Sequence, residues 1–292
     1  MNWGGVWVAL VTPFRLKKVD VSALEKLVIR LMEANVNGIV PCATTGEGSA
    51  LTDEEFSQVI QTVLKCVNEK IPVVPGTGSN NTEHTIHRTK LAKKLGAQGA
   101  LVVTPYYVKP PQEGLCKHYE RIVEETDFSL MLYNVPGRTA VNMLPETVEK
   151  LSKDSRICAI KECASLPQVS ELILRVGKKM SVLSGEDAVF LPFLSLGGHG
   201  IVSVVANLIP IEWVYLYEQF VKGNLNGAQQ TFLKFASLVE VLFVESNPIP
   251  LKAAMARIGL IEEEVRLPLS NLSENNISVL ERELAKHQLV KL

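Results

Sequence analysis

The chain has 292 residues, of which 47% are hydrophobic and 21% charged, and its formal net charge at pH 7 is -1. This composition is typical of a globular protein and excludes an intrinsically disordered chain. A net charge so close to zero provides no basic field for nucleic acid or for an anionic membrane. Five cysteines without a Cys-x-x-Cys pair favour reduced thiols in a cytoplasmic protein over disulfides or a thiolate zinc site.

Two apolar segments could imitate targeting signals. Residues 1–14 lack the basic start of a secretory signal peptide. Residues 188–211 contain no Asp, Glu, Lys or Arg, but Pro192, Gly198 and Pro210 are among the residues that interrupt them. A helix, a tight turn and a buried strand explain this segment better than a membrane span. We therefore predict a protein without a membrane span.

Short apolar runs, each followed by an amphipathic stretch, recur along the chain. Their starting points are spaced 20 to 34 residues apart, enough for one strand, one helix and two loops. Because both alternating sets of side chains in a run are apolar, the runs are typical of parallel strands covered on both faces. The expected strands begin near Val6, Gly38, Pro72, Ala100, Ser129, Ile157, Met180 and Gly200.

The stretches between these runs carry helix signals. Ser22 with Glu25, and Thr52 with Glu55, have the spacing of N-terminal capping boxes. Gly96 stands where a helix is expected to end. The first helix should bury one apolar face, made of Leu24, Leu27, Val28 and Leu31.

Eight strand–helix units predict the fold class α/β and, within it, a (β/α)8 TIM barrel over residues 1–223. An open doubly wound sheet is the alternative, but the first turn, Thr-Pro-Phe-Arg-Leu-Lys-Lys, lacks the glycines that such a fold usually carries there. Three helical segments follow, at 224–244, 249–259 and 275–287. We expect residues 224–292 to be a C-terminal helical extension that forms one structural unit with the barrel.

The carboxyl ends of barrel strands surround the active site. The most informative residue there is Lys161, which follows the apolar run 157–160. Partial desolvation would lower its pKa, and a neutral amine can attack a carbonyl to form a Schiff base. Equally, Lys161 could pair with Glu162 or extend to solvent, and position alone does not separate these interpretations.

Two further segments lie at strand ends. Residues 43–48 read Ala-Thr-Thr-Gly-Glu-Gly, and the backbone N–H groups of such a turn can hold a carboxylate, although an ordinary turn is as good an interpretation. Residues 133–138 read Tyr-Asn-Val-Pro-Gly-Arg. Tyr133 could move a proton or simply pack in the core, and Arg138 could clamp a substrate carboxylate.

Metal and nucleotide signatures are missing from the sequence. The five histidines give no His-Glu-x-x-His motif, and the pair His84 and His87 has no evident third ligand, so we predict no metal. There is no Walker A motif and nothing typical of a nicotinamide or flavin site. The segments after the last two predicted strands contain no Lys or Arg, which favours a substrate with carboxylates over one with phosphates.

Three motifs occur in order, one per unit: Thr44-Thr45-Gly46-Glu47, Tyr133 to Arg138, and Ile160-Lys161-Glu162. With them, the sequence resembles the 4-hydroxy-tetrahydrodipicolinate (dihydrodipicolinate) synthase family of class I aldolase-like enzymes, which are related to N-acetylneuraminate lyase. The resemblance extends from Val11-Thr12-Pro13 to Asn247-Pro248-Ile249-Pro250.

The resemblance implies condensation of pyruvate with L-aspartate 4-semialdehyde, a step of diaminopimelate and lysine biosynthesis that needs no cofactor. Lys161 would form an imine with pyruvate. Tyr133, Thr44 and Tyr107 would relay protons, with Tyr107 supplied by a neighbouring subunit of a homotetramer built as a dimer of dimers.

The resemblance also implies the substrate contacts. Thr45 would hold the pyruvate carboxylate, Arg138 would orient the semialdehyde, and the backbone of Gly185 and Val202 would line the site. Arg138 favours the synthase over lyases acting on N-acetylneuraminate or 2-keto-3-deoxy sugar acids. A non-catalytic protein that binds keto acids is a third interpretation, but it would not need a desolvated lysine beside the relay residues.

The resemblance also bears on feedback inhibition by lysine. The family's inhibitor cleft matches this sequence at Asn80 and Tyr106. It departs at His84, where sensitive enzymes tend to carry Glu, and at Phe56, where they tend to carry His. Because the carboxylate that would pair with the lysine amino group is absent, we predict weak inhibition.

Overall fold

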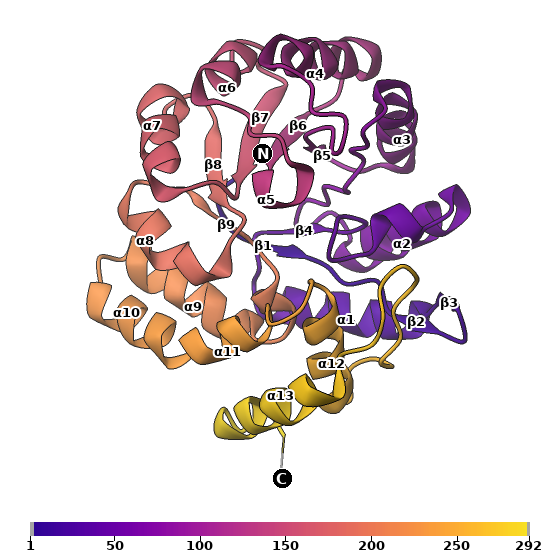
Figure 1. Ribbon diagram of the computed structural model, residues 1–292, viewed down its shortest axis with the longest axis vertical. Coiled ribbons are helices and arrows are strands. Elements are labelled where there is room, and N and C mark those ends of the chain that lie inside the picture. The colour runs from indigo at the N-terminus through magenta and orange to yellow at the C-terminus, as the bar shows by residue number, and fades with distance from the viewer. Residues whose placement is uncertain (1–2, 291–292) are drawn as a thin grey trace.

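The computed structural model describes residues 3–290 as a barrel of parallel strands surrounded by helices (Figure 1). Seven strands form one sheet in the order β4-β1-β9-β8-β7-β6-β5. Each strand pairs in parallel with its neighbour in that order. The strands are β1 (Gly5–Ala9), β4 (Gly38–Val40), β5 (Ala100–Val103), β6 (Leu130–Asn134), β7 (Ile157–Glu162), β8 (Ser181–Ser184) and β9 (Gly200–Ser203).

The predicted run at Pro72 closes the barrel between β4 and β5. Val73 bridges to Ile39 of β4, and Gly76 bridges to Leu101 of β5, both in parallel. Pro72 and Pro75 have no N–H to donate, so the hydrogen-bond ladder is interrupted and this segment forms isolated bridges in place of a regular strand. The predicted TIM barrel is confirmed.

Helices follow the strands around the outside of the barrel (Figure 1). One connection was not predicted: after β1 the chain forms a small antiparallel hairpin of β2 (Phe14–Arg15) and β3 (Lys18–Val19). The barrel helices are α1 (Val21–Glu33), α2 (Asp53–Val67), α3 (Thr82–Leu95), α4 (Gln112–Thr126), α5 (Pro136–Thr139), α6 (Pro145–Leu151), α7 (Leu166–Val176), α8 (Phe190–Ser195) and α9 (Pro210–Val221). Short 3-10 turns occur at η1 (Gly48–Ala50), η2 (Asp187–Val189) and η3 (Val205–Asn207).

The helix signals in the sequence were mostly right. The capping box of Thr52 and Glu55 is present at the start of α2, and Gly96 ends α3 in the left-handed conformation. The capping box predicted at Ser22 is wrong. Asp20 is the N-cap of α1, and its carboxylate accepts a hydrogen bond from the Ala23 N–H at 3.0 Å. Aspartate is as good an N-cap as serine, so the helix begins two residues earlier.

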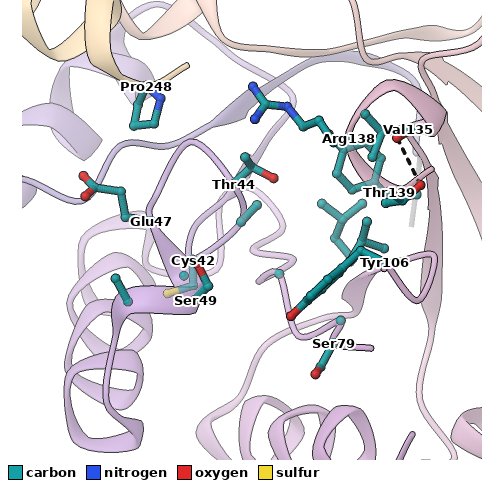
Figure 2. Close-up of a pocket in the computed structure, with 18 of the residues that line it drawn as sticks. Cys42, Thr44, Glu47, Ser49, Ser79, Tyr106, Val135, Arg138, Thr139 and Pro248 are labelled. Carbon is teal, nitrogen blue, oxygen red and sulfur yellow. Dashed lines mark hydrogen bonds between the residues drawn. The ribbon is translucent and has the colours of Figure 1, made fainter. Parts of the chain in front are cut away.

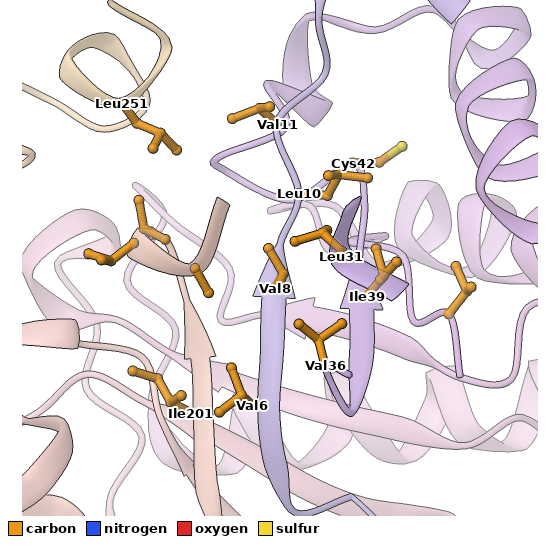
Figure 3. Close-up of a cluster of buried hydrophobic side chains, with 14 of the residues drawn as sticks. Val6, Val8, Leu10, Val11, Leu31, Val36, Ile39, Cys42, Ile201 and Leu251 are labelled. Atoms are coloured by element: carbon orange, nitrogen blue, oxygen red, sulfur yellow. The ribbon is translucent and has the colours of Figure 1, made fainter. Parts of the chain in front are cut away.

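Alternating side chains of β1 divide the interior into two cores. Val6 and Val8 face the surrounding helices and belong to a large buried cluster (Figure 3). Trp7 and Ala9 face into the barrel and belong to a smaller cluster there. The first helix buries its predicted face against the outer cluster. The inner cluster fills the barrel below the strand ends, so it supports any site formed above it.

The C-terminal extension consists of α10 (Leu225–Lys234), α11 (Ala236–Val241), α12 (Ile249–Arg257) and α13 (Glu274–Lys286). The helix predicted over 224–244 is in fact two helices, with Phe235 at the junction. Leu251 of α12, together with Leu280 and Leu284 of α13, joins the same outer cluster as the barrel side chains. No helix in residues 3–290 is long and apolar enough to cross a membrane.

Candidate active site

A cavity of about 500 Å³ lies at the carboxyl ends of the barrel strands. Its lining includes three of the predicted catalytic or substrate residues, Thr44, Tyr133 and Arg138. Thr44 and Glu47 lie on one side of the cavity, and Arg138 and Tyr106 lie on the other (Figure 2). The structure thus brings together motifs that are about ninety residues apart in the sequence.

Lys161 is not among the residues that line this cavity, but it lies beside Tyr133, which is. It is only 4% exposed, and its Nζ lies 4.5 Å from the centre of the Tyr133 ring. The two residues are partners in the register of β6 and β7, which places both side chains on the same face of the sheet. Burial lowers the pKa of Lys161, while the nearby acidic groups Glu186 and Asp187 act in the opposite direction. The amine is therefore more easily neutral than an exposed lysine.

The interpretation that Lys161 pairs with Glu162 is wrong. Adjacent residues of a strand point to opposite faces, and the Glu162 carboxylate accepts hydrogen bonds from Asn134 Nδ2 at 2.9 Å and the Ala164 N–H at 2.7 Å. Gln168 donates a further hydrogen bond to it at 3.3 Å. Burial raises the pKa of Glu162 to about 7. Lys161 is buried as well, so it does not extend to solvent.

The ring of Tyr133 lies beside the Lys161 amine. Its side chain is buried, and this burial raises the pKa of the phenol well above its usual value of 10.0. A hydrogen bond with Thr44 partly offsets that rise. The phenol is therefore protonated at neutral pH and can donate its proton. Thr44, on the turn after β4, is the hydrogen-bond partner of this phenol and also lines the cavity.

Gly185 is required by the close packing around Lys161. A methyl group on Gly185 would lie 2.2 Å from Cys163 Sγ and 2.8 Å from Lys161 Cε, too close for either atom. The Gly185 N–H donates to the carbonyl of Glu162 at 2.8 Å, which holds the end of β8 beside β7. The absence of a side chain at residue 185 leaves the space that the lysine needs.

We expect Gly185→Ala to lower kcat/KM by roughly 10²-fold, because a displacement of about 1 Å at a reacting group has this effect. The thermal midpoint and the rate of imine trapping with pyruvate should be measured alongside. Gly114→Ala on α4 is the matched control, since its added methyl group would meet only proline side chains at 3.3 Å or more. Unchanged activity in Gly185→Ala would show that Lys161 has more room than the structure gives it.

The turn at residues 43–48 is built on backbone contacts. The Thr12 hydroxyl donates to the carbonyl of Gly46 at 2.7 Å, and the Gly48 N–H donates to the carbonyl of Ala43 at 3.0 Å. Thr45 is 2% exposed, and its Oγ1 accepts a hydrogen bond from Asn247 Nδ2 at 2.9 Å. The turn is therefore a fixed element, and the C-terminal extension holds one of its threonines.

The remaining predicted residues occupy different places. Val202 is fully buried in the barrel interior, with Tyr133 in the same cluster. Tyr107 is 85% exposed and is not part of the cavity lining. Of the predicted lysine cleft, His84 and Tyr106 line the cavity but Asn80 does not. A single chain therefore leaves Tyr107 outside its own site.

Three residues near the site were missed by sequence reasoning. Cys163 and Glu186 share a hydrogen bond close to Lys161, and burial raises the pKa of both side chains. Asn247 lines the cavity, and its buried Oδ1 has no hydrogen-bond partner among the residues that the structure describes. Glu186 directly follows Gly185, which was expected to line the site, so the sequence could have placed Glu186 near it. Asn247 was noted only as part of the last motif of the resemblance, and no role was predicted for it because it lies outside the barrel units.

The acidic and thiol groups do not form a metal centre. Within residues 3–290, no group of three or more His, Cys, Asp or Glu side chains is arranged to hold a metal ion. The site offers instead a buried amine, a protonated phenol, hydroxyl groups and an arginine. These groups suit covalent chemistry on a small keto acid.

Comparisons with known proteins agree with this chemistry. The profile of the dihydrodipicolinate synthetase family matches residues 2–287. The 4-hydroxy-tetrahydrodipicolinate synthase of Thermodesulfovibrio yellowstonii is 48% identical over 288 residues, which cover 98% of this chain and 99% of that protein.

Solved structures give the same result. A monomeric variant of dihydrodipicolinate synthase has a TM-score of 0.97 and 41% identity, over 98% of this chain and 97% of that one. The chloride-inhibited dihydrodipicolinate synthase of Acinetobacter baumannii, solved in complex with pyruvate, has a TM-score of 0.96 and 40% identity, over 99% of this chain and all of that one. The family resemblance noted in the sequence is confirmed.

Proposed function

The chain belongs to the dihydrodipicolinate synthetase family, and we propose that it condenses pyruvate with L-aspartate 4-semialdehyde to form 4-hydroxy-tetrahydrodipicolinate. This is a lyase-class step of diaminopimelate and lysine biosynthesis. The observation that carries the proposal is the buried amine of Lys161 beside the protonated phenol of Tyr133, which lines a cavity together with Arg138.

The reaction uses only groups that the chain supplies, so we propose no cofactor. The neutral amine of Lys161 attacks C2 of pyruvate, and loss of water gives an imine. Loss of a proton from the pyruvate methyl group gives an enamine, whose carbon attacks the aldehyde of the second substrate. The amino group of that substrate then attacks the imine carbon, closing the ring and releasing Lys161. Tyr133 and Thr44 carry protons between these steps.

The two substrates are distinguished by the groups around the cavity. The turn with Thr44 and Thr45 supplies hydroxyl and N–H donors for the carboxylate of pyruvate. Arg138 supplies a charged donor for the carboxylate of the semialdehyde. The semialdehyde also has an ammonium group, and the unpartnered Oδ1 of Asn247 is an acceptor on the cavity wall that fits it. Gly185 leaves space beside Lys161, and Val202 packs in the same inner cluster as Tyr133.

In this proposal, the proton relay of Tyr133 and Thr44 is completed by Tyr107 of a second subunit. Tyr107 is 85% exposed, and it adjoins the exposed side chains of Tyr106 and Val108. Such an apolar group is typical of a protein interface. We propose that Tyr107 enters a neighbouring subunit's site in a homotetramer, and that the enzyme acts in the cytoplasm.

A paired assay tests the function. One arm supplies pyruvate and L-aspartate 4-semialdehyde, coupled to the next reductase so that NADPH oxidation is the signal. The other arm supplies N-acetylneuraminate and detects released pyruvate. Turnover in the first arm alone supports the synthase. Turnover in the second arm alone would indicate a sugar-acid lyase that uses the same lysine chemistry. No turnover in either arm would contradict the proposal.

We expect lysine to inhibit this enzyme weakly. At the predicted inhibitor cleft, His84 and Arg88 of α3 line the cavity wall. No carboxylate of α3 lines the cavity, so this helix offers no partner for the lysine amino group. The measurement is steady-state velocity at increasing lysine concentration, with His84→Glu as the informative variant. Strong inhibition of the unmodified protein at low lysine concentration would contradict this expectation.

A further inference from the structure

We propose that the buried ion pair between Glu47 and Lys252 is a positioning device, by which the C-terminal extension holds the turn that receives pyruvate. The proposal rests on the proposed function, since it assigns the turn at residues 43–48 to the carboxylate of pyruvate. Neither residue reaches the reacting atoms. Their role is to set the position of Thr44 and Thr45.

The pair is buried and its hydrogen bonds are short. Lys252 Nζ lies 2.6 Å from Glu47 Oε1, and the side chains are 0% and 2% exposed. Lys252 Nζ also donates to the carbonyl of Thr12 at 2.9 Å, and it lies 4.3 Å from the centre of the Phe14 ring. Burying two charges is costly, so such a pair is weak evidence for stability alone and invites a different explanation.

Glu47 connects the turn to two separate segments of the extension. Its Oε1 accepts from Lys252 of α12, and its Oε2 accepts from the backbone N–H of Arg266 at 2.8 Å. An apolar side chain could fill the same space but could not accept these directed hydrogen bonds. The carboxylate thereby fixes the turn in more than one direction.

The backbone of the turn connects Glu47 directly to the threonines. The Glu47 N–H donates to the carbonyl of Thr44 at 3.1 Å, so the two residues close one tight turn. Glu47 itself has a positive φ of 52°, and a methyl group on the next residue, Gly48, would lie 1.8 Å from the carbonyl oxygen of Cys42. Because the backbone is packed this closely, a shift of Glu47 must move Thr44 or break these contacts.

The residue just before the N-cap of the same helix holds the neighbouring threonine. Asn247, just before α12, donates to Thr45 at 2.9 Å, and Lys252 lies within α12. Residues from one short segment of the extension therefore contact both ends of the Thr45–Glu47 stretch. Pro248 and Glu47 both line the cavity and lie on the same side of it (Figure 2). The extension is thus part of the pyruvate-binding apparatus.

The test separates positioning from stability by removing the charges singly and together. Lys252→Met leaves a buried carboxylate without its cation, so this variant should lose thermal stability. The double variant Glu47→Gln, Lys252→Met has no unpaired charge and should recover most of that stability. We expect the double variant still to show a KM for pyruvate raised about tenfold, the effect of losing one strong hydrogen bond. Its KM for L-aspartate 4-semialdehyde should change less than the KM for pyruvate, because Arg138 is on α5 and Asn247 is on the extension, so neither belongs to the turn that loses its anchor.

Arg257→Gln is the matched control. Arg257 is also on α12 and pairs with Glu263 and Glu281, but it does not contact the turn. It should lower stability and leave both KM values unchanged. A pyruvate KM that returns to the wild-type value together with the stability, in the double variant, would overturn the positioning role.

Hydrogen exchange without substrate tests the structural part separately. Amides of residues 43–50 should exchange faster in the double variant than in the wild type, and Arg257→Gln should not change them. Equal exchange in all three proteins would contradict the proposal. Failure of wild-type protein to form a trapped imine with pyruvate would instead contradict the proposed function, and the exchange result would still decide whether the pair holds the turn.

Discussion

Replacement of Lys161 by alanine should abolish synthase activity, with kcat reduced on the order of 10⁴- to 10⁶-fold, as loss of a covalent nucleophile does elsewhere. The reason is that no other described lysine lies under Tyr133 at the cavity, and water cannot form the imine. Reduction of the protein with cyanoborohydride in the presence of pyruvate should add one three-carbon group to Lys161. Intact-mass and peptide measurements would locate that group, and the alanine variant should acquire none at the site.

The pH dependence of trapping follows from the environment of Lys161. Burial lowers the pKa of its amine, so the reactive neutral form appears at lower pH than in exposed lysines, whose pKa is about 10.4. Trapping at Lys161 should therefore rise with pH and level off before exposed lysines begin to react. Lys161→Arg is the control, because it keeps a cation in place without a nucleophile. Trapping of equal extent in wild type and Lys161→Ala would refute the assignment.

Replacement of Tyr133 by phenylalanine should lower kcat by roughly 10²- to 10⁴-fold, the usual contribution of a positioned proton donor. The ring still covers Lys161, whose Nζ lies 4.5 Å from its centre, so only the hydroxyl and its hydrogen bond with Thr44 are lost. Steady-state kinetics would show the loss in kcat. The thermal midpoint should change little.

Tyr119 provides a matched control for Tyr133. It is also fully buried, and its hydroxyl donates to the carbonyl of Val102 at 3.0 Å, away from the cavity. Tyr119→Phe should cost about 1 kcal/mol of stability and leave kcat unchanged. If both phenylalanine variants lose stability and neither loses kcat, Tyr133 has a packing role only.

The burial of Lys161 and Tyr133 explains how a neutral amine and a protonated phenol can lie side by side in the site. Burial disfavours the charged form of each group, so it lowers the pKa of the Lys161 amine and raises the pKa of the Tyr133 phenol. The amine is thereby made more nucleophilic and the phenol remains a proton donor. One physical cause, exclusion of water at the strand ends, prepares both partners.

The barrel and the motifs were predictable from local sequence. Apolar runs of regular spacing gave strand starts within one residue at Ala100, Ile157 and Gly200, because parallel strands must be apolar on both faces. The run with Pro72 and Pro75 was correctly placed in the barrel, although its prolines prevent a regular strand. Thr44, Tyr133 and Lys161 were correctly expected at strand ends, but their chemistry was predicted only from the family resemblance that their motifs carry.

Local sequence did less well where two residues compete for one role. Ser22 and Asp20 can both cap a helix, and only the path of the chain after the β2–β3 hairpin selects Asp20. Similarly, position alone could not say whether Lys161 pairs with Glu162. The alternation of the strand separates the two side chains and gives Glu162 its own partners, Asn134 and Gln168.

By itself, then, the sequence determined the parallel barrel and the family, because both depend on residue types at short, regular spacings, and through the family resemblance it indicated Lys161 as the candidate nucleophile. Only the tertiary structure decided what surrounds them. The approach of Asn247 to Thr45 and of Lys252 to Glu47 joins residues more than two hundred positions apart. Such contacts depend on how the C-terminal extension packs against the barrel, and no local pattern records that packing.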